Sequence, residues 1–100
     1  MDYVVTIYQC GTDTPYVFQS YDYAKDKINL DDYKEVFGGS IKDCHYSITQ
    51  LLDKVFEWGQ GPIPHHFQCR SVSMSDIIKV NDKYYYVDTF GFKELDINAR

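Results

Sequence analysis

One segment of the sequence has the clear pattern of an amphipathic helix, and it constrains the fold more than any other feature. Apolar residues recur at i, i+3, i+4, i+7 and i+8, which places them in one stripe along a helix: Ile48, Leu51, Leu52, Val55 and Phe56. Ser47 and Gln50 have the spacing of a capping box at its start, and Gly59 stands where the helix would end. β-type segments precede and follow this helix, so the sequence predicts an α+β fold.

The first part of the chain contains two predicted strands. Residues 3–9 are β-branched and aromatic on both sides of the pleat, which favours a central position in a sheet. Asp22 is positioned to cap a short helix over residues 22–27, with Ile28 and Leu30 turned to the core. Residues 33–37 read as a second strand that Gly38-Gly39 ends, with residues 40–41 as a continuing edge.

The last third predicts a hairpin. Residues 73–80 lead into the turn pair Asn81-Asp82, and residues 84–87 follow. A two-residue turn would pair Val80 with Lys83 and Ile78 with Tyr85. With a short strand at 93–95, we expect one small domain over residues 1–100. It would be a largely antiparallel sheet of about four or five strands packed against one main helix.

Composition excludes several classes of protein. The chain has 100 residues, of which 44% are hydrophobic, and this fits one globular domain rather than a disordered chain. A net charge of -5 argues against a protein that coats nucleic-acid phosphates, because such binding needs clustered Lys and Arg. No run approaches the roughly 20 apolar residues of a membrane span, and the N-terminus lacks a signal-peptide pattern. We therefore expect a cytoplasmic protein.

Acidic and aromatic residues gather in the first third of the chain. Residues 1–35 hold seven acids and three lysines, a local net charge of -4, and ten of the 17 aromatics of the chain are Tyr. A solvated face that keeps the protein soluble would have the same composition. Tyrosine is also enriched at the centre of protein interfaces, so we take as a candidate partner-binding surface the residues Tyr21, Asp22, Tyr23, Asp26, Asp31, Asp32, Tyr33 and Glu35.

Cysteine and histidine residues give only a weak signal for chemistry. Five residues of metal-binding type are present, but only His66 and Cys69 have the spacing of a zinc-ligand pair: Cys44, His45, His65, His66 and Cys69. A thiol nucleophile such as Cys44 would need a base and an oxyanion site, and no nucleophile motif surrounds it. We expect no cofactor, no metal site and no enzyme activity, with a metal- or thiol-dependent enzyme as the less favoured alternative.

Two polar segments are interpreted as turns before they are interpreted as sites. Residues 71–76 alternate Ser with apolar residues, which fits a strand with one polar face or a turn in which Ser75 or Asp76 accepts backbone N–H groups. Asp88 precedes Thr89 and has the same character, with an Asx-type turn as its first interpretation and a contact acid as its second.

The order of these motifs resembles the YodL-like domain family. Residues 71–78 (SVSMSDII) are similar to a Ser-rich segment of that family. Residues 85–94 (YYVDTFGFKE) are similar to its segment that begins Tyr-Tyr-Val-Asp. Upstream pieces at 7–9, 33–41 and 51–56 stand in the expected order. Cys69-Arg70 and the loop at 58–67 depart from the family pattern.

The resemblance implies the kind of organism and genetic element in which the protein occurs, and it implies no particular activity. The family is typical of low-GC Gram-positive bacteria and of their mobile elements, where small acidic proteins often inhibit host defence. We therefore expect a non-catalytic inhibitor of a CRISPR effector nuclease of Cas9 type. The inhibitor would bind the nuclease protein and would not bind nucleic acid directly. The alternative is a regulatory or structural interaction domain with no defence role.

Overall fold

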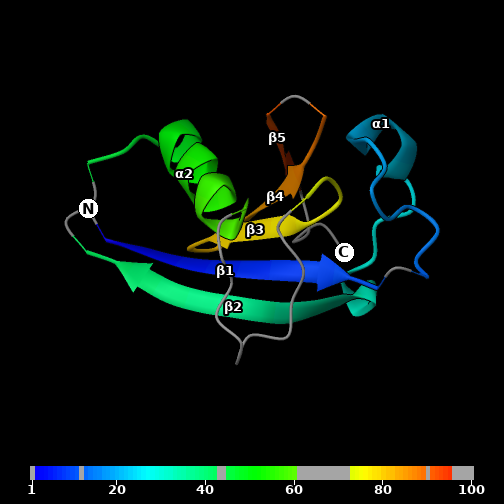
Figure 1. The fold of residues 1–100 in the computed structure, drawn as a ribbon, viewed down its shortest axis with the longest axis horizontal. Helices are drawn as coiled ribbons and strands as arrows, with labels where there is room; N and C mark the ends of the chain where they lie inside the picture. The colour runs from blue at the N-terminus through cyan, green and yellow to red at the C-terminus, as the bar shows by residue number, and fades with distance from the viewer. Residues whose placement is uncertain (1, 12, 43–44, 61–72, 90, 96–100) are drawn as a thin grey trace.

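The structure is a computed structural model that describes residues 2–11, 13–42, 45–60, 73–89 and 91–95. Within this part of the chain five strands form one antiparallel sheet, in the order β2-β1-β3-β4-β5. Figure 1 shows the strands β1 (Tyr3–Cys10), β2 (Tyr33–Ile41), β3 (Ile77–Val80), β4 (Lys83–Val87) and β5 (Phe92–Leu95). The helices are α1 (Tyr21–Ala24), the 3₁₀ turn η1 (Leu30–Asp32) and α2 (Ile48–Gln60). The expected α+β fold with one main helix is confirmed.

Helix α2 covers one face of the sheet with its apolar stripe. Leu51, Leu52 and Val55 are buried, and they pack in one cluster with side chains of β1, β3 and β4: Tyr3, Val5, Ile7, Ile78, Val80, Tyr85 and Val87. The predicted capping box is present, because the Gln50 N–H donates to Ser47 Oγ (3.2 Å) and the Ser47 N–H donates to Gln50 Oε1 (2.9 Å). No helix in the described residues is long and apolar enough to cross a membrane.

The β3–β4 hairpin has the predicted register. Val80 pairs with Lys83 and Ile78 with Tyr85, across the turn at residues 81–82. Asn81 adopts a positive φ of 56°, which this tight hairpin turn requires and which Asn tolerates better than most residues. Strand β1 lies between β2 and β3, as its apolar character on both faces predicted.

The prediction that Gly38-Gly39 ends the second strand was wrong. β2 runs through both glycines to Ile41, because each is paired in the ladder, Gly38 with Thr6 and Gly39 with Val5. The irregularity lies earlier, at residue 36. Phe37 pairs with Ile7 and Glu35 with Tyr8, which leaves one extra residue between them in the manner of a β-bulge.

The segment before β3 is a turn and not a strand. β3 begins at Ile77 rather than at residue 73. Asp76 Oδ2 accepts the Ser73 N–H at 2.9 Å, and the Asp76 N–H donates to the Ser73 carbonyl at 3.1 Å. This confirms the interpretation of Ser73 to Asp76 as a turn closed by its acid.

The first helix is shorter than predicted and starts earlier. Its N-cap is Ser20 rather than Asp22, and it ends at Ala24 instead of continuing to residue 27. The Lys27 N–H donates to the Ala24 carbonyl at 2.7 Å, so the chain closes a turn there. Ile28 and Leu30 are half-buried and pack inward as expected.

Residues 13–32 of the chain cover the second face of the sheet. Side chains alternate across each strand, so Cys10, Ile77 and Tyr86 point away from α2 and pack with Tyr16 and Ala24 in a separate cluster. In Figure 1, α2 lies over the beginning of β1, whereas α1 and η1 lie beyond its end. The two faces of the sheet are therefore covered at opposite ends.

Candidate interaction surface

The cluster on the second face is built largely from tyrosines. Tyr16 and Tyr86 are almost fully buried, at 1% and 0% exposed. Half-buried Tyr21 and Tyr33 pack against the same cluster. The Tyr16 and Tyr33 ring centroids lie 6.2 Å apart, and the Tyr21 ring meets the Tyr86 ring edge-on at 5.8 Å. These are favourable aromatic geometries, so this cluster is an aromatic counterpart of the aliphatic core under α2.

Tyrosine hydroxyls hold residues 13–32 and the strands beneath them in place. Tyr86 Oη donates to the Gln19 carbonyl at 2.7 Å, and Tyr33 Oη donates to the Ser75 carbonyl at 2.6 Å. Tyr16 Oη donates to Asp32 Oδ2 at 2.8 Å, within the segment itself. Each bond satisfies the polar tip of a ring whose body is wholly or partly buried. The hydroxyls therefore fix where α1 and η1 lie.

Ser75 connects the turn before β3 to the segment on the second face. It is fully buried, and its φ is 84°. Its Oγ accepts the Phe18 N–H at 3.0 Å, and its own N–H donates to the Val87 carbonyl at 3.0 Å. Asp88 adds a second connection, because its Oδ1 accepts the N–H groups of Tyr21 (2.9 Å) and Thr89 (2.7 Å). Asp88 thus accepts backbone N–H groups as a turn acid does, but the bond to Thr89 joins adjacent residues and an Asx turn joins residues two apart, so the Asx-type turn at Asp88 stays a prediction.

Burial extends to higher pH the range over which these phenols stay protonated. The pKa of Tyr16 is raised to about 12, chiefly by desolvation; the neighbouring Asp32 carboxylate adds to the rise, and the hydrogen bond to the Asn29 backbone opposes it. Desolvation also raises the pKa of Tyr33 and of Tyr86 above the usual value of 10.0. A neutral phenol donates a hydrogen bond, which the charged form cannot do.

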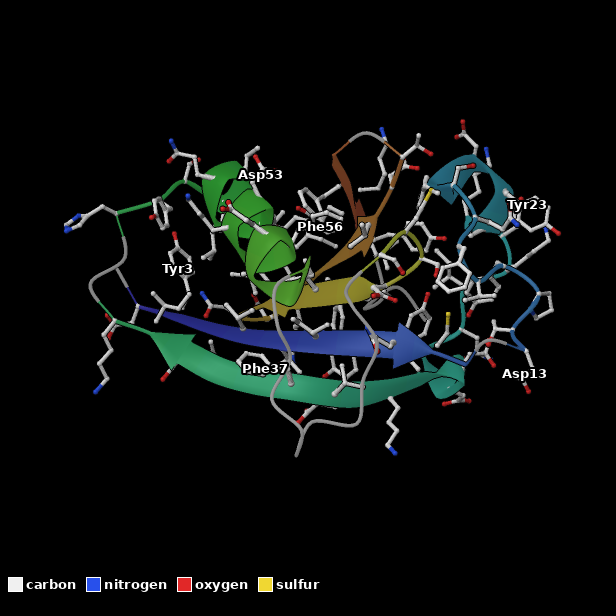
Figure 2. All side chains as sticks on the ribbon, viewed as in Figure 1. Tyr3, Asp13, Tyr23, Phe37, Asp53 and Phe56 are labelled. Atoms are coloured by element: carbon white, nitrogen blue, oxygen red, sulfur yellow. The ribbon has the colours of Figure 1, made fainter. Side chains whose placement is uncertain are left out.

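The eight candidate residues divide into two groups. Tyr21 and Tyr33 are half-buried members of the tyrosine cluster, and Asp32 is exposed but accepts the bond from Tyr16. The others are exposed on α1, on η1, between them or on β2, and we call them the acidic end: Asp22, Tyr23, Asp26, Asp31 and Glu35. Tyr23 is 47% exposed and lies on the outer side of α1 (Figure 2).

Three lysines lie among these acids, Lys25 and Lys27 around α1 and Lys34 on β2. Lys25 and Lys27 are both exposed. Lys27 Nζ lies 4.4 Å from the centre of the Tyr23 ring and donates to the Tyr23 carbonyl at 3.0 Å. A cation over an aromatic face is attractive, so Lys27 orients the exposed ring of Tyr23 while the carboxylates around it outnumber the lysines.

Sequence reasoning missed the residues that support this surface. Tyr16 and Asn29 are thirteen residues apart, and the Asn29 N–H donates to Tyr16 Oη at 3.3 Å. The Asn29 side chain in turn accepts the Asp31 N–H at 3.0 Å and caps η1. Phe18 was also missed, although it is 46% exposed at a φ of 61°. The apolar run at residues 16–18 was the only signal, and it did not show which ring turns inward.

The possible metal and thiol residues fall mostly outside the described residues. Cys44, His65, His66 and Cys69 lie there, as does the side chain of Trp58. His45 is exposed. Within the described part of the chain no group of three His, Cys, Asp or Glu could hold a metal ion. Expectations about metal and thiol chemistry therefore stay predictions.

Comparison with known proteins identifies the family and no individual relative. No curated protein and no solved structure matches the chain. The sequence matches the YodL-like domain over residues 4–97, which covers every strand and helix described above apart from Tyr3, the first residue of β1. The chain belongs to the YodL-like domain family.

Proposed function

We propose that this chain is a cytoplasmic, non-catalytic interaction protein that inhibits a defence nuclease of Cas9 type by occupying its nucleic-acid-binding surface. The observation that supports the proposal is the acidic end. The four carboxylates of the acidic end and the ring of Tyr23 are exposed and lie within residues 22–35. Asp88 and the Tyr86 hydroxyl attach this segment to the sheet through Tyr21 and Gln19, and the Tyr16–Asp32 bond closes the segment internally.

Charge complementarity explains how such a surface would act. A nucleic-acid groove is lined by Arg and Lys, which favour a negative partner over a neutral one. Carboxylates at the acidic end would take the place of phosphates, and Tyr23 would add an aromatic contact of the kind enriched at interface centres. The net charge of -5 steers the chain toward a basic surface in the same way.

Attachment of the segment to the sheet lowers the cost of binding. A loop that is ordered only in the complex loses conformational entropy on association. Here the Tyr16–Asp32 bond, the Tyr86–Gln19 bond and the Asn29 cap fix the segment before any partner arrives. Asp31 is adjacent to Asp32, and its N–H donates to the Asn29 side chain. The same bonds therefore also fix the position of Asp31.

The test is inhibition of DNA cleavage by a purified Cas9–guide RNA complex. The variant Asp22→Lys/Asp26→Lys/Asp31→Lys reverses three exposed acids of the acidic end. Asp32 is left unchanged because it accepts the hydroxyl bond of Tyr16. We expect the wild-type chain to block cleavage and the triple variant to need at least about a hundredfold higher concentration, which is on the order of 3 kcal/mol.

A matched variant separates position from total charge. Asp53→Lys/Glu57→Lys/Asp82→Lys makes the same change in net charge at exposed residues of α2 and of the β3–β4 turn. We expect it to inhibit like the wild type apart from a modest loss in steering. Equal loss in the two variants would reject the acidic end as the site, and no inhibition by the wild-type chain would reject the proposed function.

A further inference from the structure

The two edges of the sheet differ in how they are protected. β5, at one edge, is four residues long and carries exposed Lys93 and Glu94. β2, at the other edge, is nine residues long; it carries exposed Lys34 and Glu35 near its start but neither charge nor proline over residues 36–41. No strand in the described residues pairs with the outer side of β2. Long, uncharged edge strands are the ones that pair with further strands.

Backbone bonds of β1 show which groups of β2 face outward. The Val4 carbonyl accepts the Asn81 N–H at 2.8 Å and the Val4 N–H donates to Asn81 Oδ1, so both groups point toward β3. Backbone direction alternates along a strand, so Val5 points toward its partner Gly39 on β2. Gly39 then faces β1, and the N–H and C=O groups of Gly38 and Ser40 face away from β1, at the outer side of β2.

We propose that β2 is a dimerisation strand, along which two copies of the chain pair antiparallel. In the register we assign, Gly39 lies opposite the partner's Gly39. Gly38 then forms a hydrogen-bonded pair with the partner's Ser40, and Ser40 with the partner's Gly38, which uses the outward groups of both strands. This inference is independent of the proposed function.

Side chains near this axis are complementary to those of a second copy in this register. A Cβ at Gly39 would lie 3.7 Å from Cε1 and Cζ of Phe37, so the Phe37 ring leans over its own Gly39. Phe37 is 41% exposed. With two glycines facing each other at the axis, the Phe37 rings of both copies would meet over them. Phe37 would also lie opposite the partner's half-buried Ile41, an apolar cross-strand pair.

The extent of the ladder sets the strength of the dimer. The irregularity at residue 36 interrupts the pairing pattern at one end, and β2 ends at Ile41 at the other. An interface of one short strand is at the small end of the range for specific complexes. We therefore expect a reversible dimer that forms as protein concentration rises.

The experiment is sedimentation equilibrium of the full chain from low-micromolar to near-millimolar concentration. We expect the average mass to rise from 11.7 kDa toward twice that value. Ser40→Pro removes an N–H that points away from β1, so the backbone bonds between β1 and β2 remain. Proline is tolerated at such a position of an edge strand. It should keep the mass at 11.7 kDa, whereas Ser40→Ala should dimerise like the wild type.

A second variant decides the case if Ser40→Pro does not fold, as judged by circular dichroism. Phe37→Lys places a charge from each copy at the axis and should also abolish the dimer. A wild-type mass of 11.7 kDa at every concentration would overturn the proposal and leave the edge to a strand of another protein. Growth beyond two copies, or a dimer that survives both variants, would overturn it as well.

Discussion

The two faces of the sheet are stabilised by different kinds of contact. Under α2 the core consists mainly of aliphatic side chains such as Val5, Leu51 and Ile78. On the other face the cluster is rich in tyrosines, whose hydroxyls hydrogen-bond to Gln19, Asp32 and Ser75. Burial of aliphatic area is nondirectional, whereas hydroxyl bonds fix positions. The first face therefore carries stability, and the second fixes the segment that presents the acidic end.

The largest effect is expected from a change under α2. Leu51 is fully buried, and Leu51→Ala removes its apolar area and leaves a cavity in the aliphatic core. We expect a loss of about 2–5 kcal/mol in the free energy of unfolding, measured by urea denaturation. Leu30→Ala, at a half-buried position on the second face, should cost clearly less; a larger loss there would reverse the comparison.

Alkaline pH should weaken the second face most. The pKa of Tyr16 is about 12 in the folded chain against 10.0 for an ordinary tyrosine. Because the folded state keeps the proton longer, the stabilisation is complete below pH 10 and is lost as pH rises through 12. The difference amounts to on the order of 3 kcal/mol. Urea denaturation at a series of pH values across this range measures the loss in the free energy of unfolding. A free energy of unfolding that does not change with pH, in Tyr16→Phe and in the wild type alike, would contradict the prediction.

Loss of one hydroxyl should loosen the segment without unfolding the domain. Tyr16→Phe removes the donor to Asp32 and the acceptor for the Asn29 N–H, and we expect a cost of about 1 kcal/mol. Hydrogen exchange should speed up at residues 16–32 and stay unchanged in α2. Tyr23→Phe is the matched control, since its ring is 47% exposed. Equal effects of the two changes would show that the Tyr16 hydroxyl does not fix the segment.

The smallest effect is expected at the start of α2. Ser47→Ala removes the acceptor for the Gln50 N–H at an exposed position. The cost is about 0.5–1 kcal/mol, at the low end for a helix cap because water replaces the lost bond. Thr49→Ala, also exposed, should change the melting temperature less. If the two variants melt alike, the capping box adds nothing to α2.

Features set by neighbouring residues were predictable from the sequence. The stripe from Ile48 to Phe56 and the turn at Asn81-Asp82 depend on residues close in the chain, and both the helix and the hairpin register were correct. Gly38-Gly39 was misjudged because glycine weakens a strand locally, whereas pairing with Val5 and Thr6 keeps the strand continuous. That pairing spans more than thirty residues and leaves no local signal.

The candidate surface was predictable in composition but not in orientation. The acids and tyrosines of residues 21–35 were identified, yet nothing local shows that Tyr21 and Tyr33 turn inward while Tyr23 turns outward. Their orientation depends on Ser75, Tyr86 and Asp88, more than forty residues away. Long-range contacts therefore decide which residues of an aromatic and acidic segment are available to a partner.

Hydrogen exchange of the chain, alone and bound to a Cas9–guide RNA complex, tests the central claim most directly. The claim is that the second face presents the acidic end to the nuclease, while the face under α2 supplies stability. We expect slower exchange at residues 21–35 in the complex and no change in residues 48–57. Protection of α2 with none at residues 21–35 would contradict the account.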